Sequence, residues 1–341
     1  MDKNFNRVYI GYTVYSLYLY LLYSTEEEIG DTFFFFGEGI NGNIRDRFEN
    51  SHYFNNAMYE NKNMFSRFIY RIRLRNQSHK KWPFLKNAQL FAQDHFFFSA
   101  ALIADRRYTL IEDAPNVFLR HRKAINKQKK TFLHLVYLAK RIFHKVIENS
   151  FSGEMGENAQ CESVLMTNIE SDVILRDKRL IQVNEMEYWN KATESKKDII
   201  LAVYNITRED IQQLRNRKII VFTQNFATLG FLPEQELIDL YSECLSKYPS
   251  DEIIIKKHAF DTVDYQKYFP DAYIFDKIVP MQLLNLLEIR YETAVTICSS
   301  AVLSFPYDIH IDWIGTEGNA KLLAAVGKQE LEAYYANSKA Q

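Results

Sequence analysis

Two apolar runs in the C-terminal part of the chain are each followed by side chains that suit a phosphate. Lys256 and His258 follow the run EIII, and Ser299 and Ser300 follow AVTIC. A histidine exchanges or donates a proton near neutral pH, and a neighbouring lysine can neutralise growing negative charge. Hydroxyls at the start of a helix can bind phosphate, although a serine there is often only a helix cap. We expect the His258 imidazole and the two serine hydroxyls to converge, from neighbouring strand ends, around a departing nucleotide phosphate, with Lys256 nearby.

Carboxylates that could accept a proton stand in two further places. Glu112 and Asp113 end the apolar run YTLI, and Glu234 and Glu236 begin a helix at PEQEL. A carboxylate enclosed in a site can act as a general base. An acidic turn explains the first pair equally well, and glutamates are favoured at any helix start by the helix dipole. The pattern therefore leaves Glu112, Asp113 and one of the pair Glu234 and Glu236, of which we favour Glu236, as candidates for the base.

Two more patterns follow strands. Thr223 and Gln224 end the run KIIVFTQ, where polar side chains can either hydrogen-bond a nucleotide or cap a turn. The stretch from Gly37 to Gly42 formally matches the glycine pattern of dinucleotide-binding folds. It follows the second predicted strand rather than the first, so a tight turn before a helix is the simpler interpretation.

The elements that must position these residues alternate between short apolar runs and helices. Continuous apolar runs are typical of parallel strands that are covered on both faces. We predict an α/β protein with two Rossmann-like domains that face each other across a cleft, residues 1–195 and 196–341. Ligands of such sheets bind beyond the carboxyl ends of the strands. The predicted strands are 7–12, 31–39, 108–113, 172–177, 198–204, 218–224, 252–257, 272–276 and 294–300, and two predicted helices are 233–248 and 280–291.

Composition narrows the classes of protein that remain. The chain has 341 residues and a net charge of −1, so no overall field attracts nucleic acid. Three widely spaced cysteines argue against a thiolate zinc site and suit a reducing cytoplasm. The apolar stretch 8–23 is too short for a membrane span and lacks a cleavage site, so we predict a strand and a buried helix. The basic stretch 120–145 is either a solvated helical insertion or a peripheral contact with anionic lipid at the inner face of the cell membrane.

The order of these motifs resembles glycosyltransferase family 52, the bacterial lipooligosaccharide and capsule sialyltransferases, and the related polysialyltransferases. The resemblance is carried by EDA at 112–114, TQ at 223–224, IIIKKHAFD at 253–261, VPMQLL at 279–284 and CSSA at 298–301. It implies a GT-B type glycosyltransferase in which His258 assists the departure of CMP, Ser299 and Ser300 hold its phosphate, and Lys256 adds charge. Thr223 and Gln224 then contact the donor, and Gln282 contacts its ribose. Ala114, Ala259 and Gln282 depart from the family pattern of Gly, Pro and Glu.

The resemblance implies an inverting transfer of sialic acid from CMP-sialic acid to a terminal galactose, with an α-2,3 linkage as the first expectation. The acceptor would be a capsular polysaccharide or a lipooligosaccharide, carried on lipid. We expect no metal cofactor, because no DxD stretch ends a strand of the donor domain. A homodimer is compatible with the resemblance. Two alternatives remain open: a capsule glycosyltransferase that uses a UDP-hexose, and a non-catalytic protein that binds glycan or nucleotide.

Overall fold

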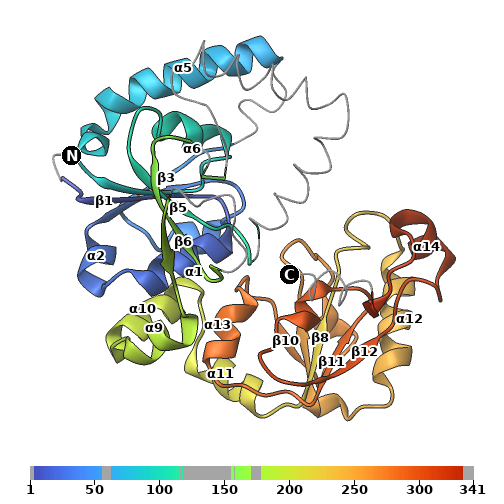
Figure 1. Cartoon of the computed structure of the whole chain (residues 1–341). Helices are drawn as coiled ribbons and strands as arrows, with labels where there is room; N and C mark the ends of the chain where they lie inside the picture. Colours follow the sequence, from blue (N-terminus) through green and yellow to red (C-terminus); the bar gives the residue numbers. More distant parts are fainter. Residues whose placement is uncertain are drawn as a thin grey trace. The chain divides into compact units, whose positions relative to one another are not determined.

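The computed structural model describes residues 4–55, 63–115, 117, 155–156, 158–169 and 178–332 (Figure 1). The chain divides into two compact units, Met1–Ile200 and Leu201–Gln341. Helix α10, Glu194–Val203, spans this division. Each unit contains one sheet, and every strand pair in both sheets is parallel. The α/β class predicted from the apolar runs is therefore confirmed.

The N-terminal unit has a seven-stranded sheet in the order β3-β2-β1-β4-β5-β6-β7. The strand order reverses direction at β1, so loops leave the sheet to opposite sides after β1 and β4, which is where α/β folds bind ligands. The strands are β1 Arg7–Gly11, β2 Thr32–Phe36, β3 Ser51–Tyr53, β4 Gln89–Ala92, β5 Tyr108–Ile111, β6 Cys161–Met166 and β7 Arg179–Gln182.

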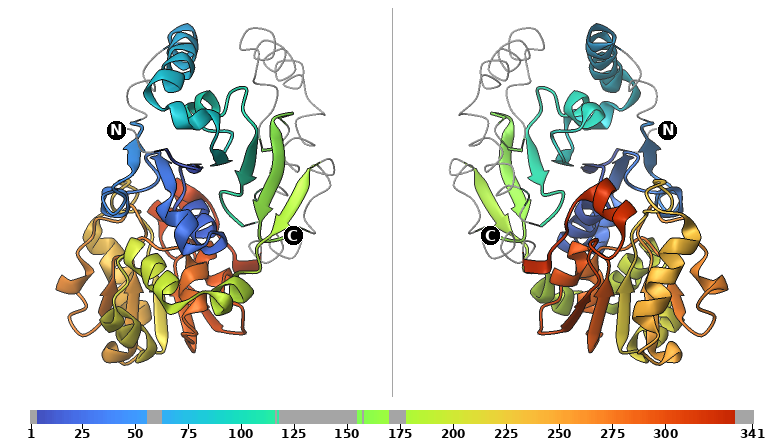
Figure 2. Two further views of the ribbon diagram at one scale, coloured as in Figure 1. Left: turned by 90° about the vertical axis from the view of Figure 1, so that its left-hand side faces the viewer. Right: turned by 90° about the vertical axis from the view of Figure 1, so that its right-hand side faces the viewer.

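Helices cover both faces of this sheet. Helices α5 and α6 pack on one face, through Leu74, Phe98 and Leu102, and α1 packs on the other (Figures 1 and 2). Helix α1 is buried for most of its length, which confirms the strand and buried helix predicted for residues 8–23. The helices are α1 Val14–Tyr23, α2 Glu26–Gly30, α3 Gly42–Arg45, α5 Met64–Lys81, η1 Pro83–Lys86, α6 Phe97–Leu102 and α9 Glu185–Lys191.

The C-terminal unit has a five-stranded sheet in the order β10-β9-β8-β11-β12, with its switch point between β8 and β11. The strands are β8 Ile219–Phe222, β9 Ile253–Lys256, β10 Tyr273–Phe275, β11 Thr293–Thr296 and β12 His310–Trp313. The helices are α11 Arg208–Arg215, α12 Glu234–Leu245, η2 Ser250–Glu252, η3 Tyr265–Lys267, α13 Met281–Leu286, η4 Ser300–Leu303 and α14 Ala320–Val326.

One predicted strand is wrong. Residues 198–204 lie in α10 and the turn after it, because Lys196, Ile200 and Val203 are buried at helical spacing and the rest of the helix is more exposed. Strands β3, β4, β6, β7 and β12 were not predicted. The predicted strand 172–177 and the basic insertion 120–145 lie outside the described residues.

The glycine stretch after β2 is explained by packing. A Cβ atom on Gly39 would lie 2.3 Å from the carbonyl oxygen of Tyr12, and one on Gly37 would lie as close to the Tyr12 ring. Both glycines therefore let the loop after β2 pass directly over the loop after β1. The tight turn is the interpretation that the structure supports.

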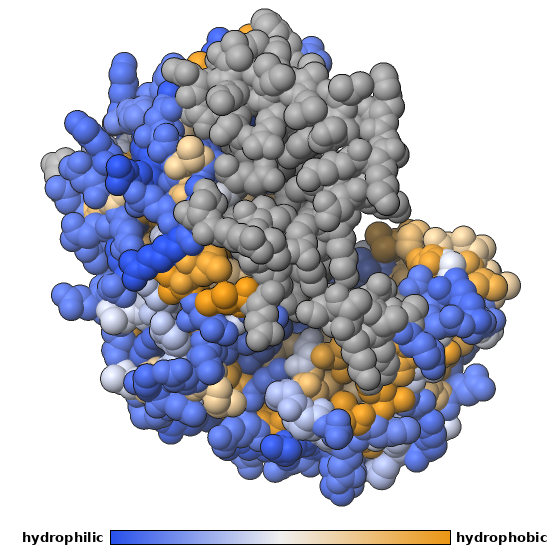
Figure 3. Space-filling model, in the orientation of Figure 1, coloured by the Kyte–Doolittle hydropathy of each residue, from blue (hydrophilic) through white to orange (hydrophobic). Residues whose placement is uncertain are grey.

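Much of the described surface is hydrophilic, with separate apolar areas between (Figure 3). Within the described part of the chain, no helix combines the length and the apolar character that crossing a membrane requires.

Candidate active site

The loop after β9 holds His258 through a buried hydrogen-bond network. The backbone N–H of His258 donates to Thr223 Oγ1 at 3.0 Å, and that hydroxyl donates to Asp261 Oδ2 at 2.6 Å. Asp261 also accepts from the Tyr265 hydroxyl at 2.9 Å and from the backbone N–H of Val263 at 3.2 Å. Asp261 and Thr223 are both buried. The network ties the turn that carries His258 to the end of β8.

The orientation of the His258 ring is defined by its own turn. The backbone N–H of Phe260 donates to His258 Nδ1 at 3.3 Å. In the neutral ring the proton must then lie on Nε2, so that the nitrogen away from the turn is a hydrogen-bond donor. Burial lowers the pKa of the imidazole, and the Lys256 ammonium lowers it further while the Asp261 carboxylate opposes them. His258 is therefore suited to donate from Nε2 while uncharged.

Lys256, the last residue of β9, places a positive charge near His258. Its ammonium lies 5.8 Å from the centroid of the Phe275 ring on β10. Burial lowers the pKa of Lys256 to about 8. Within the described residues no carboxylate forms an ion pair with it, which leaves its charge available to an anion.

The serines lie on the other side of β8 from His258. Strands β9 and β11 each pair with β8 and not with one another. At the usual strand spacing their ends are roughly 10 Å apart. The expectation that His258 and the serines follow neighbouring strands is therefore wrong, although all end at the same edge of the sheet.

The two serines also differ in what they do. Ser299 accepts a hydrogen bond from the backbone N–H of Ala301 at 3.3 Å and caps η4, a single 3-10 turn. Its own N–H donates to Thr296 Oγ1 at 3.0 Å. Ser300 is exposed at the start of that turn. Ser299 thus has the capping role that the sequence left open, and Ser300 has the freer hydroxyl.

The remaining predicted donor residues lie at the same edge of this sheet. Gln224 follows β8 and is partly exposed, whereas the adjacent Thr223 has its hydroxyl engaged by Asp261 and by the His258 N–H. Gln282 lies in the first turn of α13 and is partly exposed. Gln224 and Gln282 are available to a ligand, and Thr223 acts on the structure of the site.

In the N-terminal unit, the two adjacent carboxylates after β5 have different surroundings. Glu112 is buried and accepts from the Tyr15 hydroxyl at 2.7 Å and from Thr167 Oγ1 at 2.6 Å. Burial raises its pKa, and these two hydrogen bonds oppose the shift. Asp113 points elsewhere: its Oδ2 lies 3.3 Å from His95 Nε2, and its Oδ1 is buried with no hydrogen-bond partner in the part of the chain that the structure describes. Asp113 is the carboxylate with free capacity to accept a proton.

His95 was not among the predicted site residues. It follows β4, which pairs with β5, so parallel pairing brings it beside Asp113 across 18 residues of chain. Its Nδ1 is also buried and has no hydrogen-bond partner among the described residues. A QDH sequence at the end of an apolar run was the signal available, but the run LFA is only three residues long.

The residues before His95 hold the loops together. Gln93 Oε1 accepts from the backbone N–H of Thr13 at 3.2 Å, and Thr13 Oγ1 donates to the carbonyl oxygen of Asp113 at 3.0 Å. Asp94 is fully buried and accepts from the Tyr108 hydroxyl and from the backbone N–H of Gly156, each at 2.8 Å. The loops after β1, β4 and β5 thus form one hydrogen-bonded edge that carries His95 and Asp113.

Glu236, the third candidate base, lies in the first turn of α12 and forms an ion pair with Lys321 of α14. Its side chain is 40% exposed. The ion pair explains the residue without a catalytic role. Within the described residues, no three His, Cys, Asp or Glu side chains are grouped closely enough to hold a metal ion.

Two parallel α/β sheets, each with polar side chains at its carboxyl edge, are the architecture of the GT-B fold. The chain resembles solved bacterial sialyltransferases of this fold at 11–12% identity. An α/β-galactoside α-2,3-sialyltransferase from Photobacterium phosphoreum gives a TM-score of 0.56 and covers 95% of each chain. The GT-B domain of a sialyltransferase from Photobacterium damselae gives 0.53, covering 90% of this chain and 89% of that one. A Photobacterium 2,6-sialyltransferase in complex with CMP and lactose gives 0.54, covering 88% and 69%.

Sequence comparison identifies the family. Residues 17–314 match the model of glycosyltransferase family 52, and the chain belongs to that family. An uncharacterised protein of Haemophilus influenzae is 26% identical over 321 residues, covering 93% of this chain and 96% of its own. The family predicted from the motif order is confirmed.

Proposed function

We propose that the protein is an inverting sialyltransferase that moves sialic acid from CMP-sialic acid to a terminal galactose. The observation that carries the proposal is the pair at the end of β9. Lys256 has no ion-pair partner among the described residues, and the Nδ1 atom of His258 accepts from its own turn, so that Nε2–H can donate to a ligand. A leaving phosphate needs a positive charge and a hydrogen-bond donor that are already oriented. Membership of family 52 and the fold shared with sialyltransferases support this donor.

The C-terminal unit supplies the groups that meet the donor. His258 Nε2–H and the Lys256 ammonium stabilise the phosphate oxygens, and Ser300 adds a hydroxyl. Gln224 and Gln282 hydrogen-bond the nucleoside. As the bond between C2 of sialic acid and the phosphate oxygen breaks, the electron pair leaves with CMP. The uncharged His258 strengthens its hydrogen bond to this oxygen as the negative charge grows.

The N-terminal unit supplies the base. Asp113 takes the proton of the galactose hydroxyl while the hydroxyl oxygen bonds to C2 from the face opposite CMP, which inverts the anomeric centre. The free Oδ1 of Asp113 favours it over Glu112, whose carboxylate is buried and already hydrogen-bonded, and over the ion-paired Glu236. We place the natural acceptor among galactose-terminated capsular or lipooligosaccharide glycans. The linkage, metal independence and a homodimer stay predictions.

A donor screen with lactose as the acceptor tests the proposal. Purified protein should release CMP from CMP-sialic acid and form sialyllactose, and His258→Ala should lower that rate at least about 100-fold. The exposed His310 at the start of β12 provides a matched control, and His310→Ala should leave the rate unchanged. Release of UDP from a UDP-hexose in place of CMP would refute the donor and favour the capsule glycosyltransferase. Binding of CMP without transfer to any galactoside would favour a non-catalytic protein.

A further inference from the structure

A pocket lies at the opposite edge of the N-terminal sheet from Asp113. It has a volume of about 430 Å³, and its lining includes Gln89, Thr109 and Arg179, which stand at the amino ends of β4, β5 and β7. Asp113 follows the carboxyl end of β5, four residues beyond Thr109, which is roughly 13 Å along a strand. The pocket is therefore separate from the candidate active site.

The floor of this pocket is polar where a parallel sheet is normally apolar. Thr109 and Ser163 are paired in register on β5 and β6, and their hydroxyls hydrogen-bond each other at 2.8 Å. They lie on the face opposite the apolar core that contains Tyr108 and Val164. Parallel strands covered on both faces usually carry Val, Ile or Leu at such positions. Packing alone does not account for two adjacent hydroxyls.

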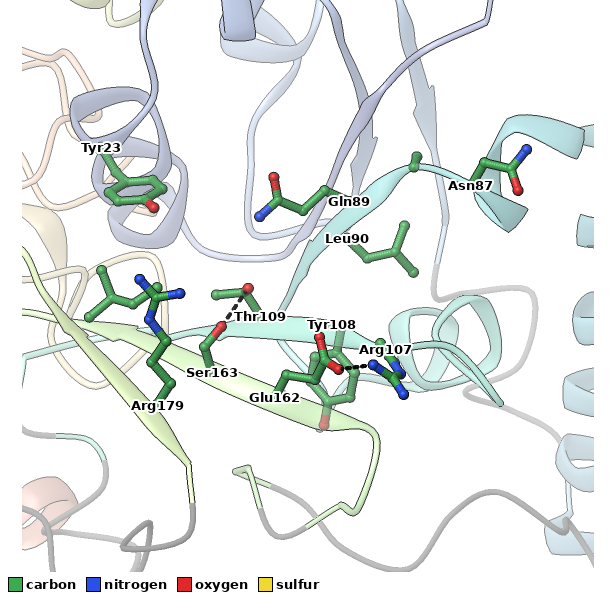
Figure 4. A pocket seen from close by; sticks show the side chains of 12 residues that line it. Tyr23, Asn87, Gln89, Leu90, Arg107, Tyr108, Thr109, Glu162, Ser163 and Arg179 are labelled. Atoms are coloured by element: carbon green, nitrogen blue, oxygen red, sulfur yellow. Dashed lines mark hydrogen bonds and ion pairs between the residues drawn. The ribbon is translucent and has the colours of Figure 1, made fainter.

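An irregularity in β6 shapes one end of the pocket. The pairing steps from Tyr108↔Cys161 to Thr109↔Ser163, so that Glu162 is an extra residue without a partner in β5. Its carboxylate pairs with the Arg107 guanidinium at 2.7 Å (Figure 4). Bulges of this kind redirect side chains and are enriched near functional sites. The pair presents both a donor and an acceptor at the mouth of the pocket.

The other end carries an unopposed positive charge. The side chain of Arg179, the first residue of β7, forms no ion pair or hydrogen bond within the described residues. In the close-up it lies at the same end of the pocket as Tyr23 (Figure 4). Two arginines and one glutamate line the pocket, so its net charge is positive. A guanidinium binds a carboxylate through two parallel hydrogen bonds. An aromatic ring beside it offers a surface to the C–H face of a sugar.

We infer that this pocket is an accessory saccharide site that takes a sugar carrying a carboxylate. Arg179 binds the carboxylate, the ring of Tyr23 contacts the sugar, and Gln89 and the Arg107–Glu162 pair hydrogen-bond its hydroxyls. The volume suits one or two sugar units. The site would retain an acidic glycan away from the proposed reacting centre. The inference does not depend on the proposed donor.

Binding of free N-acetylneuraminic acid to the full-length protein, followed by saturation-transfer NMR and calorimetry with CMP present in excess, tests this site. We expect saturable binding that Arg179→Gln weakens at least about tenfold, as loss of a charge-assisted hydrogen bond implies. The matched control is Arg208→Gln, at the exposed start of α11 in the other unit, which should bind as the unchanged protein does. Gln89→Ala provides a second variant and should weaken binding less.

Three results would overturn the inference. Equal binding by the unchanged protein and Arg179→Gln would place the sugar elsewhere. Displacement of the sugar by an equal concentration of inorganic phosphate would reduce the pocket to a plain anion site. Galactose binding as tightly as the acidic sugar would remove the role of the carboxylate. Because the donor screen reads CMP release, a failure here leaves the proposed function standing.

Discussion

Replacing Thr223 with valine tests whether this residue binds the donor or positions His258. Valine matches threonine in shape and removes only the hydroxyl, which donates to Asp261 and accepts from the His258 N–H. The change leaves a backbone N–H without its acceptor and a buried carboxylate with two of its three hydrogen bonds. We expect the free energy of unfolding to fall by about 2–3 kcal/mol. Thr223→Ser keeps the hydroxyl and should restore most of the loss.

The kinetic consequence follows from the turn that carries His258. Without the Thr223 hydroxyl the turn is no longer tied to β8, so Nε2–H is held less well toward the leaving phosphate. Misplacement of a reacting group by about 1 Å can cost roughly 100-fold in rate. We expect kcat for sialyl transfer to fall about 10- to 100-fold in Thr223→Val, with little change in the Kd of CMP.

A double-mutant cycle with His258→Ala separates the two roles. If Thr223 acts through His258, Thr223→Val should lower kcat little further in the His258→Ala background, whereas its effect on unfolding persists. If Thr223 contacts the nucleotide directly, the Kd of CMP should rise equally in both backgrounds. The second outcome, measured by calorimetry, would refute the positioning role.

Three more predictions follow from the same contacts. Asp113→Asn should lower kcat at least about 100-fold without changing the denaturant midpoint, whereas Glu112→Gln should lower the midpoint; the reverse pattern would make Glu112 the base. Burial lowers the pKa of Lys256 to about 8, so the ammonium loses its charge between about pH 7 and 9 and the affinity for CMP, measured by calorimetry, should fall over that range. Lys256→Met should bind CMP weakly at every pH in the range. An equal dependence of CMP affinity on pH in both proteins would contradict this prediction. Burial, and then the charge of Lys81, lowers the pKa of His52 to about 4 in the folded protein. Between pH 6.5 and about 4 the unfolded chain therefore binds a proton on His52 that the folded chain does not, and the free energy of unfolding should fall as the pH drops through this range. His52→Gln should flatten that part of the urea midpoint curve, and an unchanged curve would exclude His52 as the cause.

Much of the site could be predicted because the relevant signal is local. A short apolar run that ends in polar residues can be recognised from adjacent positions in the sequence. This pattern placed His258, Ser299 and the 112–113 pair at strand ends. The same locality explains the error at 198–204: seven mostly apolar residues suit a buried strand or a buried helix. The strand β4 was missed because the apolar run LFA is too short to stand out. His95, which follows this strand, was therefore not predicted as a site residue.

The sequence by itself determined the class of fold, the order of the motifs and the family, since these depend on residue type and spacing along the chain. Only the tertiary structure decided how the residues combine. Strand order places β8 between His258 and the serines, and parallel pairing of β4 with β5 brings His95 to Asp113. Whether a carboxylate or hydroxyl remains free depends on partners as far as 97 residues away, as Glu112 and Thr223 show. The hydrogen-bond partners of a side chain are set by the folded structure, and the spacing of residues along the sequence does not show which partners a side chain has.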